Sequence, residues 1–228
     1  MSGKAAEKRL LRDWLAAGQT AVVLDHLAGG SAKRAATLLL GLVAEADYCT
    51  RMQAVSALGQ VAEGLAAADL DAGRELMRRL LWSLNEESGA VPWGAPEALG
   101  EIMARDRRLA QEFVNLLISL IWPQGNYLEF PPLQAGVAWG LGRLAQAWPA
   151  LVTQRGATEH LTALLIAPEA QTRGCAAWAL GFLADPAAAE ALRGLLADDG
   201  PCHIFEDGHL DSTTVGVVAA NALARLGP

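Results

Sequence analysis

Hydrophobic residues follow a helical spacing along the chain, and a short motif of alanine, leucine and glycine occurs five times. The clearest copy lies at residues 172–185 and reads TRGCAAWALGFLAD. The anchoring positions of the five copies are Gly59, Gly100, Gly142, Gly181 and Ala224. Successive anchors are 41, 42, 39 and 43 residues apart. A repeat of about 40 residues with two helices per unit is typical of a helical solenoid.

Each motif helix follows a second, leucine-rich helix. We expect these preceding helices at residues 32–46, 73–84, 109–121, 158–166 and 187–197. Two further helices, at residues 4–17 and 20–27, are predicted to form a cap, because the end units of a solenoid are atypical. The sequence shows no runs of β-branched residues between turns, which favours an all-α fold. The predicted organisation is an N-terminal helical cap at residues 1–30 and one continuous solenoid of about five repeats at residues 31–228.

The motif resembles the HEAT-like repeats named after the phycobilisome lyases. The resemblance spans roughly residues 31–228, and it is carried best by Gln171–Asp185 and next by Asp47–Gly59. It implies an α-solenoid, and proteins that share these repeats perform many unrelated functions. The segments 85–89 (NEESG) and 93–98 (WGAPEA) also resemble a narrower bacterial family, a likeness that implies no particular activity.

Three positions on each motif helix share a face directed away from the buried seam: seven and three residues before the anchor, and one residue after it. In repeats of this kind the face lines the concave side of the solenoid. The predicted binding residues on it are Trp93, Glu97, Glu101, Trp139, Arg143, Trp178, Phe182 and Asn221.

This face allows two interpretations. In one, Trp139 and Trp178 stand on neighbouring helices about 10 Å apart and form an open aromatic floor that holds a partner. Charged walls would then come from Glu97 and Glu101 on one side and Arg225 on the other. In the alternative, capping loops cover both tryptophans and close the solenoid.

Three connections between paired helices are longer than the others and carry chemically capable side chains. They span residues 85–96, 122–132 and 198–214, and equivalent loops of a solenoid gather at one edge. Their predicted binding residues are Glu86, Glu87, Tyr127, Glu129, His203 and Asp207. Glu86 and Glu87 could pair with Glu129 for acid–base chemistry. Acidic groups of this kind can equally stabilise a helix start, as at Pro96-Glu97.

The third long connection holds several potential ligands for zinc or iron. These are Cys202, His203, Glu206, Asp207, His209 and Asp211. Their spacing matches no compact metal-binding signature, and a hydrated acidic loop has the same composition. The dipeptide Asp207-Gly208 is typical of a turn. The motif helices lack the His-Glu pairs that hold iron in the similarly built deoxyhypusine hydroxylases, so that resemblance excludes their activity.

Composition narrows the classes of partner. Hydrophobic residues make up 52% of the chain but aromatic residues only 6%, so alanine and leucine, both strong helix formers, dominate. A net charge of −7 argues against nucleic acid as a partner. Three scattered cysteines suit a reducing compartment. The longest apolar run, Leu116–Trp122, is interrupted by Ser119 and is too short to span a membrane, so we expect a soluble cytoplasmic protein.

These patterns favour a non-catalytic scaffold or adaptor that binds a protein or peptide segment. The alternative is a protein that handles a small molecule, like the bilin lyases, in a pocket where the loops meet the groove. A metal-dependent enzyme is the third interpretation. We assign no cofactor and no metal, and the sequence does not indicate an oligomeric state.

Overall fold

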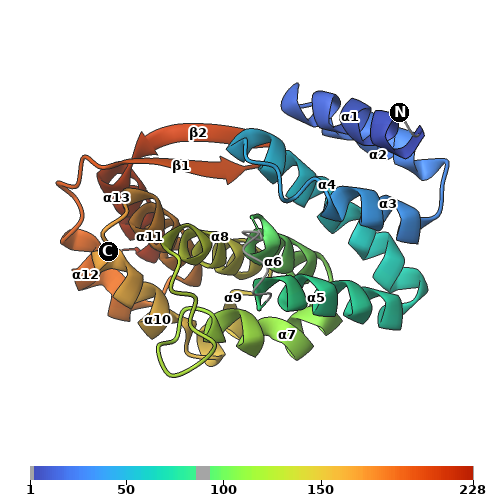
Figure 1. Cartoon of the computed structure of the whole chain (residues 1–228). Coiled ribbons are helices and arrows are strands. Elements are labelled where there is room, and N and C mark those ends of the chain that lie inside the picture. Colours follow the sequence, from blue (N-terminus) through green and yellow to red (C-terminus); the bar gives the residue numbers. More distant parts are fainter. Residues whose placement is uncertain (1–2, 86–92, 228) are drawn as a thin grey trace. The chain divides into compact units, whose positions relative to one another are not determined.

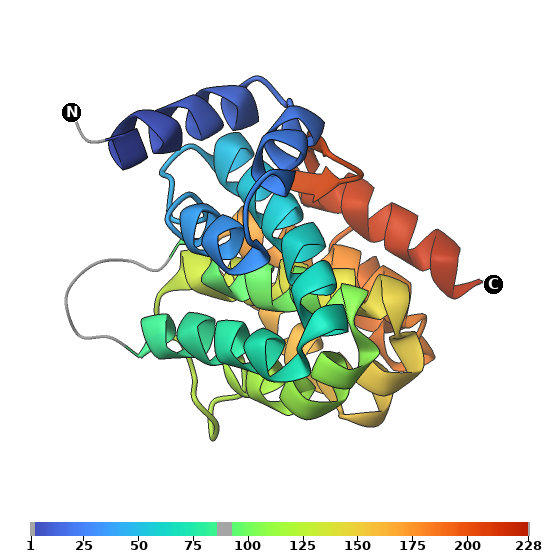
Figure 2. The same ribbon diagram turned by 90° about the vertical axis from the view of Figure 1, so that its right-hand side faces the viewer.

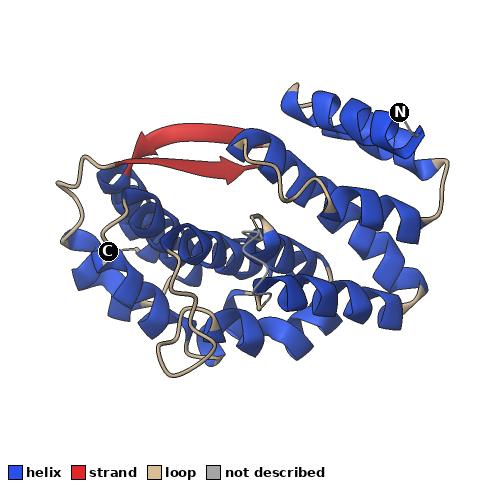
Figure 3. Ribbon diagram, in the orientation of Figure 1, coloured by secondary structure: helices blue, strands red, loops and turns tan. Residues whose placement is uncertain are grey.

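The computed structural model describes residues 3–85 and 93–227 (Figure 1). The described chain is mostly helical, with one short β-hairpin (Figure 3), and this confirms the predicted all-α class. The chain forms two compact units, an N-terminal unit of residues 1–109 and a C-terminal unit of residues 110–228. None of the described helices combines the length and the hydropathy needed to cross a bilayer.

The N-terminal unit consists of helix pairs. It begins with α1 (Gly3–Ala16), α2 (Thr20–Ala28) and α3 (Ala32–Leu40), followed by the long helix α4 (Tyr48–Ala68). α4 packs against α3, α5 (Leu70–Leu84) and α6 (Ala95–Arg105) (Figure 2). Asp47 starts α4 by accepting a hydrogen bond from the Thr50 backbone N–H at 2.8 Å, as expected of an N-cap residue. α3 ends six residues before the predicted position 46, and Gly41 follows it.

The C-terminal unit continues the pairing. Helix α7 (Arg107–Ser119) runs across the boundary between the two units. The helices that follow are α8 (Pro131–Ala147), α9 (Pro149–Gln154), α10 (Ala157–Ala163), α11 (Ala170–Leu183), α12 (Ala189–Arg193) and α13 (Val215–Leu226). Two short 3₁₀ turns, η1 (Leu164–Ile166) and η2 (Pro186–Ala188), extend α10 and precede α12. α11 packs on both α8 and α13. The five motif copies therefore lie on α4, α6, α8, α11 and α13.

Small residues in the motif permit close contact between helices, and Gly142 in α8 illustrates this. A Cβ atom added there would lie 2.4 Å from Cζ3 of Trp178 and 3.1 Å from Cα of Ala179. Only glycine leaves room for the Trp178 ring at this crossing. The motif glycine thus places an indole of α11 directly on the backbone of α8.

The connection at residues 198–214 departs from the predicted loop and forms a β-hairpin. β1 (Pro201–Glu206) pairs antiparallel with β2 (His209–Thr214), and Glu206 faces His209 across the turn. Asp207 and Gly208 have φ angles of +50° and +81°, as a two-residue type I′ turn requires. The expected turn at Asp207-Gly208 is confirmed, while the strands on either side of it were not predicted.

Candidate functional site

The two tryptophans singled out by the repeat form a stack inside the C-terminal unit. Trp139 of α8 and Trp178 of α11 have ring centroids 6.0 Å apart and an interplanar angle of 8°. Phe182 meets Trp178 edge-on, with centroids 5.2 Å apart. Only 2% of Trp139 and 3% of Trp178 is exposed. The open aromatic floor is therefore not what the structure contains, and the covered alternative describes these side chains.

The cover is the hairpin. Trp139 Nε1 donates a 2.9 Å hydrogen bond to the backbone carbonyl of Phe205 in β1, and the Phe205 ring lies 6.4 Å from the Trp139 ring. β1 also packs along α11. A hydrophobic strand lying on the Trp139 indole removes it from water, so the hairpin completes the hydrophobic core of this unit.

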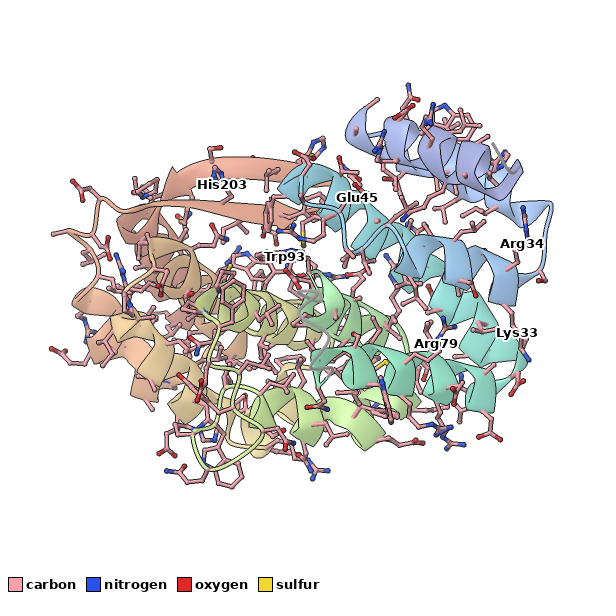
Figure 4. All side chains as sticks on the ribbon, viewed as in Figure 1. Lys33, Arg34, Glu45, Arg79, Trp93 and His203 are labelled. Carbon is pink, nitrogen blue, oxygen red and sulfur yellow. The ribbon has the colours of Figure 1, made fainter. Side chains whose placement is uncertain are left out.

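Polar side chains fasten β1 in place. Gln171 of α11 accepts from the backbone N–H of His203 at 2.9 Å and donates to the His203 carbonyl at 2.8 Å. A single side chain therefore pairs with both backbone groups of one strand residue, as a neighbouring strand would. Gln146 of α8 donates to the Glu206 carboxylate at the far end of β1. His203 itself lies on the exposed side of the hairpin, with Nδ1 3.0 Å from Ser212 Oγ (Figure 4).

The segment leading into β1 is held by an ion pair. Arg173 Nε donates to Asp198 at 2.7 Å, and Nη1 donates to the carbonyls of Ala167 and Pro168 at 2.8 Å each. The hydrogen bonds from Arg173 hold the pKa of Asp198 below its ordinary value. Because Arg173 lies in α11, the same helix positions the base of the hairpin and the stacked indole.

The two edges of the hairpin differ. In an antiparallel pair closed by a two-residue turn, alternate residues direct their backbone N–H and C=O away from the partner strand. On β1 these residues include His203 and Phe205, which Gln171 and Trp139 bind as described above. On β2 they include Leu210 and Ser212, whose backbone groups have no hydrogen-bond partner in the described part of the chain. β2 therefore presents an unpaired edge.

A small cavity of about 150 Å³ lies between the inner face of the hairpin, α11 and α13. Its polar lining residues are Trp178, Glu206, Asp211, Thr213, Asn221 and Arg225. The predicted residues Trp178 and Asn221 thus share one site, while Phe182 borders it by stacking under the Arg225 guanidinium, 4.1 Å from the ring centre. Trp178 Nε1 is buried and has no hydrogen-bond partner among the described residues.

In the N-terminal unit, Trp93 and Glu97 lie beside Arg51. The Arg51 guanidinium stands 5.4 Å from the Trp93 ring centre and donates to the Glu45 carbonyl at 2.8 Å (Trp93 and Glu45 are labelled in Figure 4). Glu97 is 5% exposed, and burial raises the pKa of its carboxyl. Its carboxyl bonds its own backbone N–H in the first turn of α6, an arrangement suited to stabilising a helix start.

Glu101, one turn further along α6, is a paired structural carboxylate. It accepts a 2.6 Å hydrogen bond from Arg105 Nε, and Arg105 also reaches Glu63 of α4 at 3.3 Å. Glu101 is 3% exposed. Glu97 and Glu101 are therefore buried side chains of α6 rather than exposed walls of a groove.

The remaining predicted residues are dispersed. Tyr127 accepts from Gln134 at 2.9 Å, Arg143 donates to Gln146, and Glu129 and Asp207 are exposed. Glu86 and Glu87 lie outside the described residues.

Among the described residues, no three His, Cys, Asp or Glu side chains are grouped as metal ligands. Cys202 is fully buried, and burial raises the pKa of its thiol to about 11.

Sequence reasoning missed Gln171, Gln146 and Phe205. The signal for the strand was present, since Ile204 and Phe205 precede an Asp-Gly dipeptide and Thr213 and Thr214 follow it. The two glutamines carry no such signal, because only the path of the strand shows what their amides bind.

Comparisons with known proteins support the fold and assign no activity. No family model matches the chain. An uncharacterized protein of Archaeoglobus fulgidus is 31% identical over 100 residues, which cover 44% of this chain and 48% of that protein. The chain thus spans about half the length of this relative.

Solved structures of similar fold include an engineered protein and a designed armadillo repeat protein. One engineered protein has a TM-score of 0.59 and 19% sequence identity to this chain. The match covers 100% of this chain and 94% of the engineered protein. A designed armadillo repeat protein in complex with the peptide (KR)4 has a TM-score of 0.57 and 18% sequence identity to this chain. The match covers 98% of this chain and 92% of the designed protein. At this level of identity the likeness concerns the fold, an armadillo-like α-solenoid.

Proposed function

We propose that the chain is a non-catalytic binding scaffold that holds an extended, basic peptide segment of another protein along the free edge of β2. The observation that carries the proposal is the difference between the two edges of the hairpin. β1 is closed by Gln171 and Trp139, whereas Leu210 and Ser212 leave backbone donors and acceptors unpaired on β2. An extended peptide that adds a strand to such an edge gains backbone hydrogen bonds from residues of any type.

Charge favours a basic segment. Residues 195–214 contain five acidic residues and no lysine or arginine. One of the five, Asp198, is paired with Arg173, which leaves Asp199, Glu206, Asp207 and Asp211 on or beside the hairpin. Opposite charge on the peptide would steer its approach and fix its register. The designed armadillo protein that binds (KR)4 is a precedent for the fold alone.

This proposal relocates the scaffold function that the repeat pattern predicts. The Trp139 indole holds β1 through its hydrogen bond to Phe205, and the partner would bind the outer edge of the hairpin itself. An exposed β-edge on a covered aromatic stack has a rigid base, which lowers the entropy lost on binding.

The test uses a labelled peptide in which lysine alternates with valine, and a matched peptide in which glutamate replaces lysine. Fluorescence anisotropy should detect binding of the lysine peptide, weakening as salt is added, and little binding of the glutamate peptide. Methylating alternate backbone nitrogens of the lysine peptide should reduce affinity by about tenfold or more, because each methyl group removes a backbone hydrogen bond.

On the protein side, Ser212→Pro removes one outward N–H and leaves the ladder with β1 intact, since proline is tolerated at a strand edge. Ser212→Ala keeps that N–H and loses only the contact with His203, so it is the matched control. Binding of the lysine peptide should fall in Ser212→Pro and persist in Ser212→Ala. Equal binding by both variants, or no binding by the parent protein, would refute the β2-edge model.

A further inference from the structure

A second site lies on the opposite, inner face of the hairpin, and it does not depend on peptide binding at the β2 edge. Its defining feature is a buried hydrogen-bond donor that has no acceptor. Trp178 is 3% exposed, and its Nε1 lacks a partner within the described part of the chain. Buried polar groups in proteins are almost always hydrogen-bonded, so an orphaned one beside a cavity indicates a missing partner.

The orientation of the indole directs this donor away from α8. The Cε3–Cζ3 edge of Trp178 lies against Gly142 of α8, where a Cβ atom would stand 2.5 and 2.4 Å from those ring carbons. Nε1 is on the opposite edge of the indole and therefore points away from α8. Trp178 itself lines the cavity, together with residues of the hairpin and α13.

A positive charge stands beside the donor. Arg225 of α13 stacks its guanidinium on the Phe182 ring at 4.1 Å, which fixes the plane of the group while leaving its N–H donors available. No ion pair of Arg225 occurs among the described residues. Asn221, one turn earlier on α13, adds an amide to the same lining. An indole N–H, a guanidinium and an amide together suit a carboxylate.

Negative charge faces these donors from the hairpin. Asp211 stands across from Ile204 in the strand pair, so both side chains belong to the inner face, and Glu206 lies on that face as well. Gln146 fixes the Glu206 carboxylate. A simple anion would be repelled by these groups, and a simple cation would leave Trp178 Nε1 without an acceptor. The lining therefore suits a ligand that carries both charges.

The size of the cavity limits the ligand further. A volume of about 150 Å³ equals about five water molecules at 30 Å³ each and is smaller than the sites of about 300 Å³ or more that hold drug-sized ligands and cofactors. Ile204 and Val218, each 5% exposed, supply apolar wall. We propose that the cavity binds a small free α-amino acid, its carboxylate on Trp178 Nε1 and Arg225 and its ammonium group on Asp211 and Glu206.

The test measures the NMR signal of the Trp178 indole N–H. Protein labelled with ¹⁵N on its seven tryptophan side chains is titrated with glycine and L-alanine, and with acetate and methylammonium as single-charge probes. The Trp178 signal, assigned by its loss in Trp178→Phe, should shift on addition of the amino acids. Acetate and methylammonium should bind about tenfold or more weakly, because each lacks one set of charge-assisted hydrogen bonds. The Trp139 signal, which reports the bond to Phe205, confirms the fold of each variant.

Two exposed substitutions keep the test independent of core packing. Asp211→Asn and Arg225→Gln should each weaken amino-acid binding about tenfold or more. Asp199→Asn and Arg193→Gln make the same charge changes outside the cavity. They should leave the affinity for the amino acid within about twofold of the parent value. The proposal is overturned if no amino acid shifts the Trp178 signal at millimolar concentration, or if acetate binds as well as glycine. Ser212→Pro alters the β2 edge and not the cavity. The peptide proposal and the amino-acid proposal can therefore each be refuted without refuting the other.

Discussion

Replacing Gly142 with alanine tests the contact on which the aromatic stack depends. The added Cβ would lie 2.4 Å from Cζ3 and 2.5 Å from Cε3 of Trp178, and 3.1 Å from the Cα of Ala179. Trp139 stacks on the ring at 6.0 Å and Phe182 meets it at 5.2 Å, so the ring can retreat only toward the cavity that it lines and must leave the stack to do so. The substitution must therefore separate α8 from α11 or tilt the indole out of the stack.

The magnitude combines two opposing effects. Overpacking a core costs about 1–3 kcal/mol, and contact with a stacked ring and a backbone atom places this case at the upper end. Alanine in a helix regains about 1 kcal/mol relative to glycine. The free energy of unfolding of the C-terminal unit should therefore fall by about 2 kcal/mol.

Gly64→Ala in α4 is the matched control, because a Cβ there would meet nothing within 4 Å. It should stabilise the N-terminal unit by up to about 1 kcal/mol. Native-state hydrogen exchange read by mass spectrometry gives a separate opening free energy for each unit. If Gly142→Ala proves as stable as the parent while Gly64→Ala behaves as expected, Trp178 does not fill the space above Gly142 as described.

Three further predictions concern the hairpin, a buried carboxyl and the cysteines. Gln171→Ala should speed amide exchange at His203 about tenfold, through loss of two hydrogen bonds to β1; unchanged exchange would mean that Gln171 does not hold the strand. Burial raises the Glu97 pKa above its ordinary 4.5, so the folded N-terminal unit retains a proton that the unfolded chain releases. Its stability relative to Glu97→Gln should fall as pH rises from 4.5 through the raised pKa, and parallel stability–pH curves would contradict this. Iodoacetamide near neutral pH should modify half-exposed Cys49 before buried Cys175 and Cys202, as peptide mapping would show; early labelling of Cys202 would contradict its burial.

The repeat was predictable because its cause is local. A motif helix needs small residues where it crosses its neighbours, and Gly142 and Gly181 mark those crossings whatever the rest of the chain does. α8 and η2 begin at Pro131 and Pro186, because proline fits the first turn of a helix and not its interior.

Burial of the predicted face was not predictable in the same way. Trp139 and Trp178 occupy positions that repeat geometry leaves open, and the path of residues 201–214 covers Trp139. That path depends on long-range contacts such as Trp139 Nε1 with Phe205, 66 residues apart. Helical spacing in a sequence carries no information on contacts of this kind.

The burial changes which part of Trp178 has functional meaning. As an exposed ring it would have offered area to a partner; as a covered ring it offers only its N–H, because its faces and its Cε3–Cζ3 edge are occupied by Trp139, Phe182 and Gly142. A core tryptophan selected for packing alone could be replaced by phenylalanine or leucine without an orphaned donor. The N–H beside Arg225 and Asn221 instead links the covered stack to the cavity. The hairpin thus moves the binding surfaces of this unit away from the aromatic floor, to its own free edge and to the cavity beneath it.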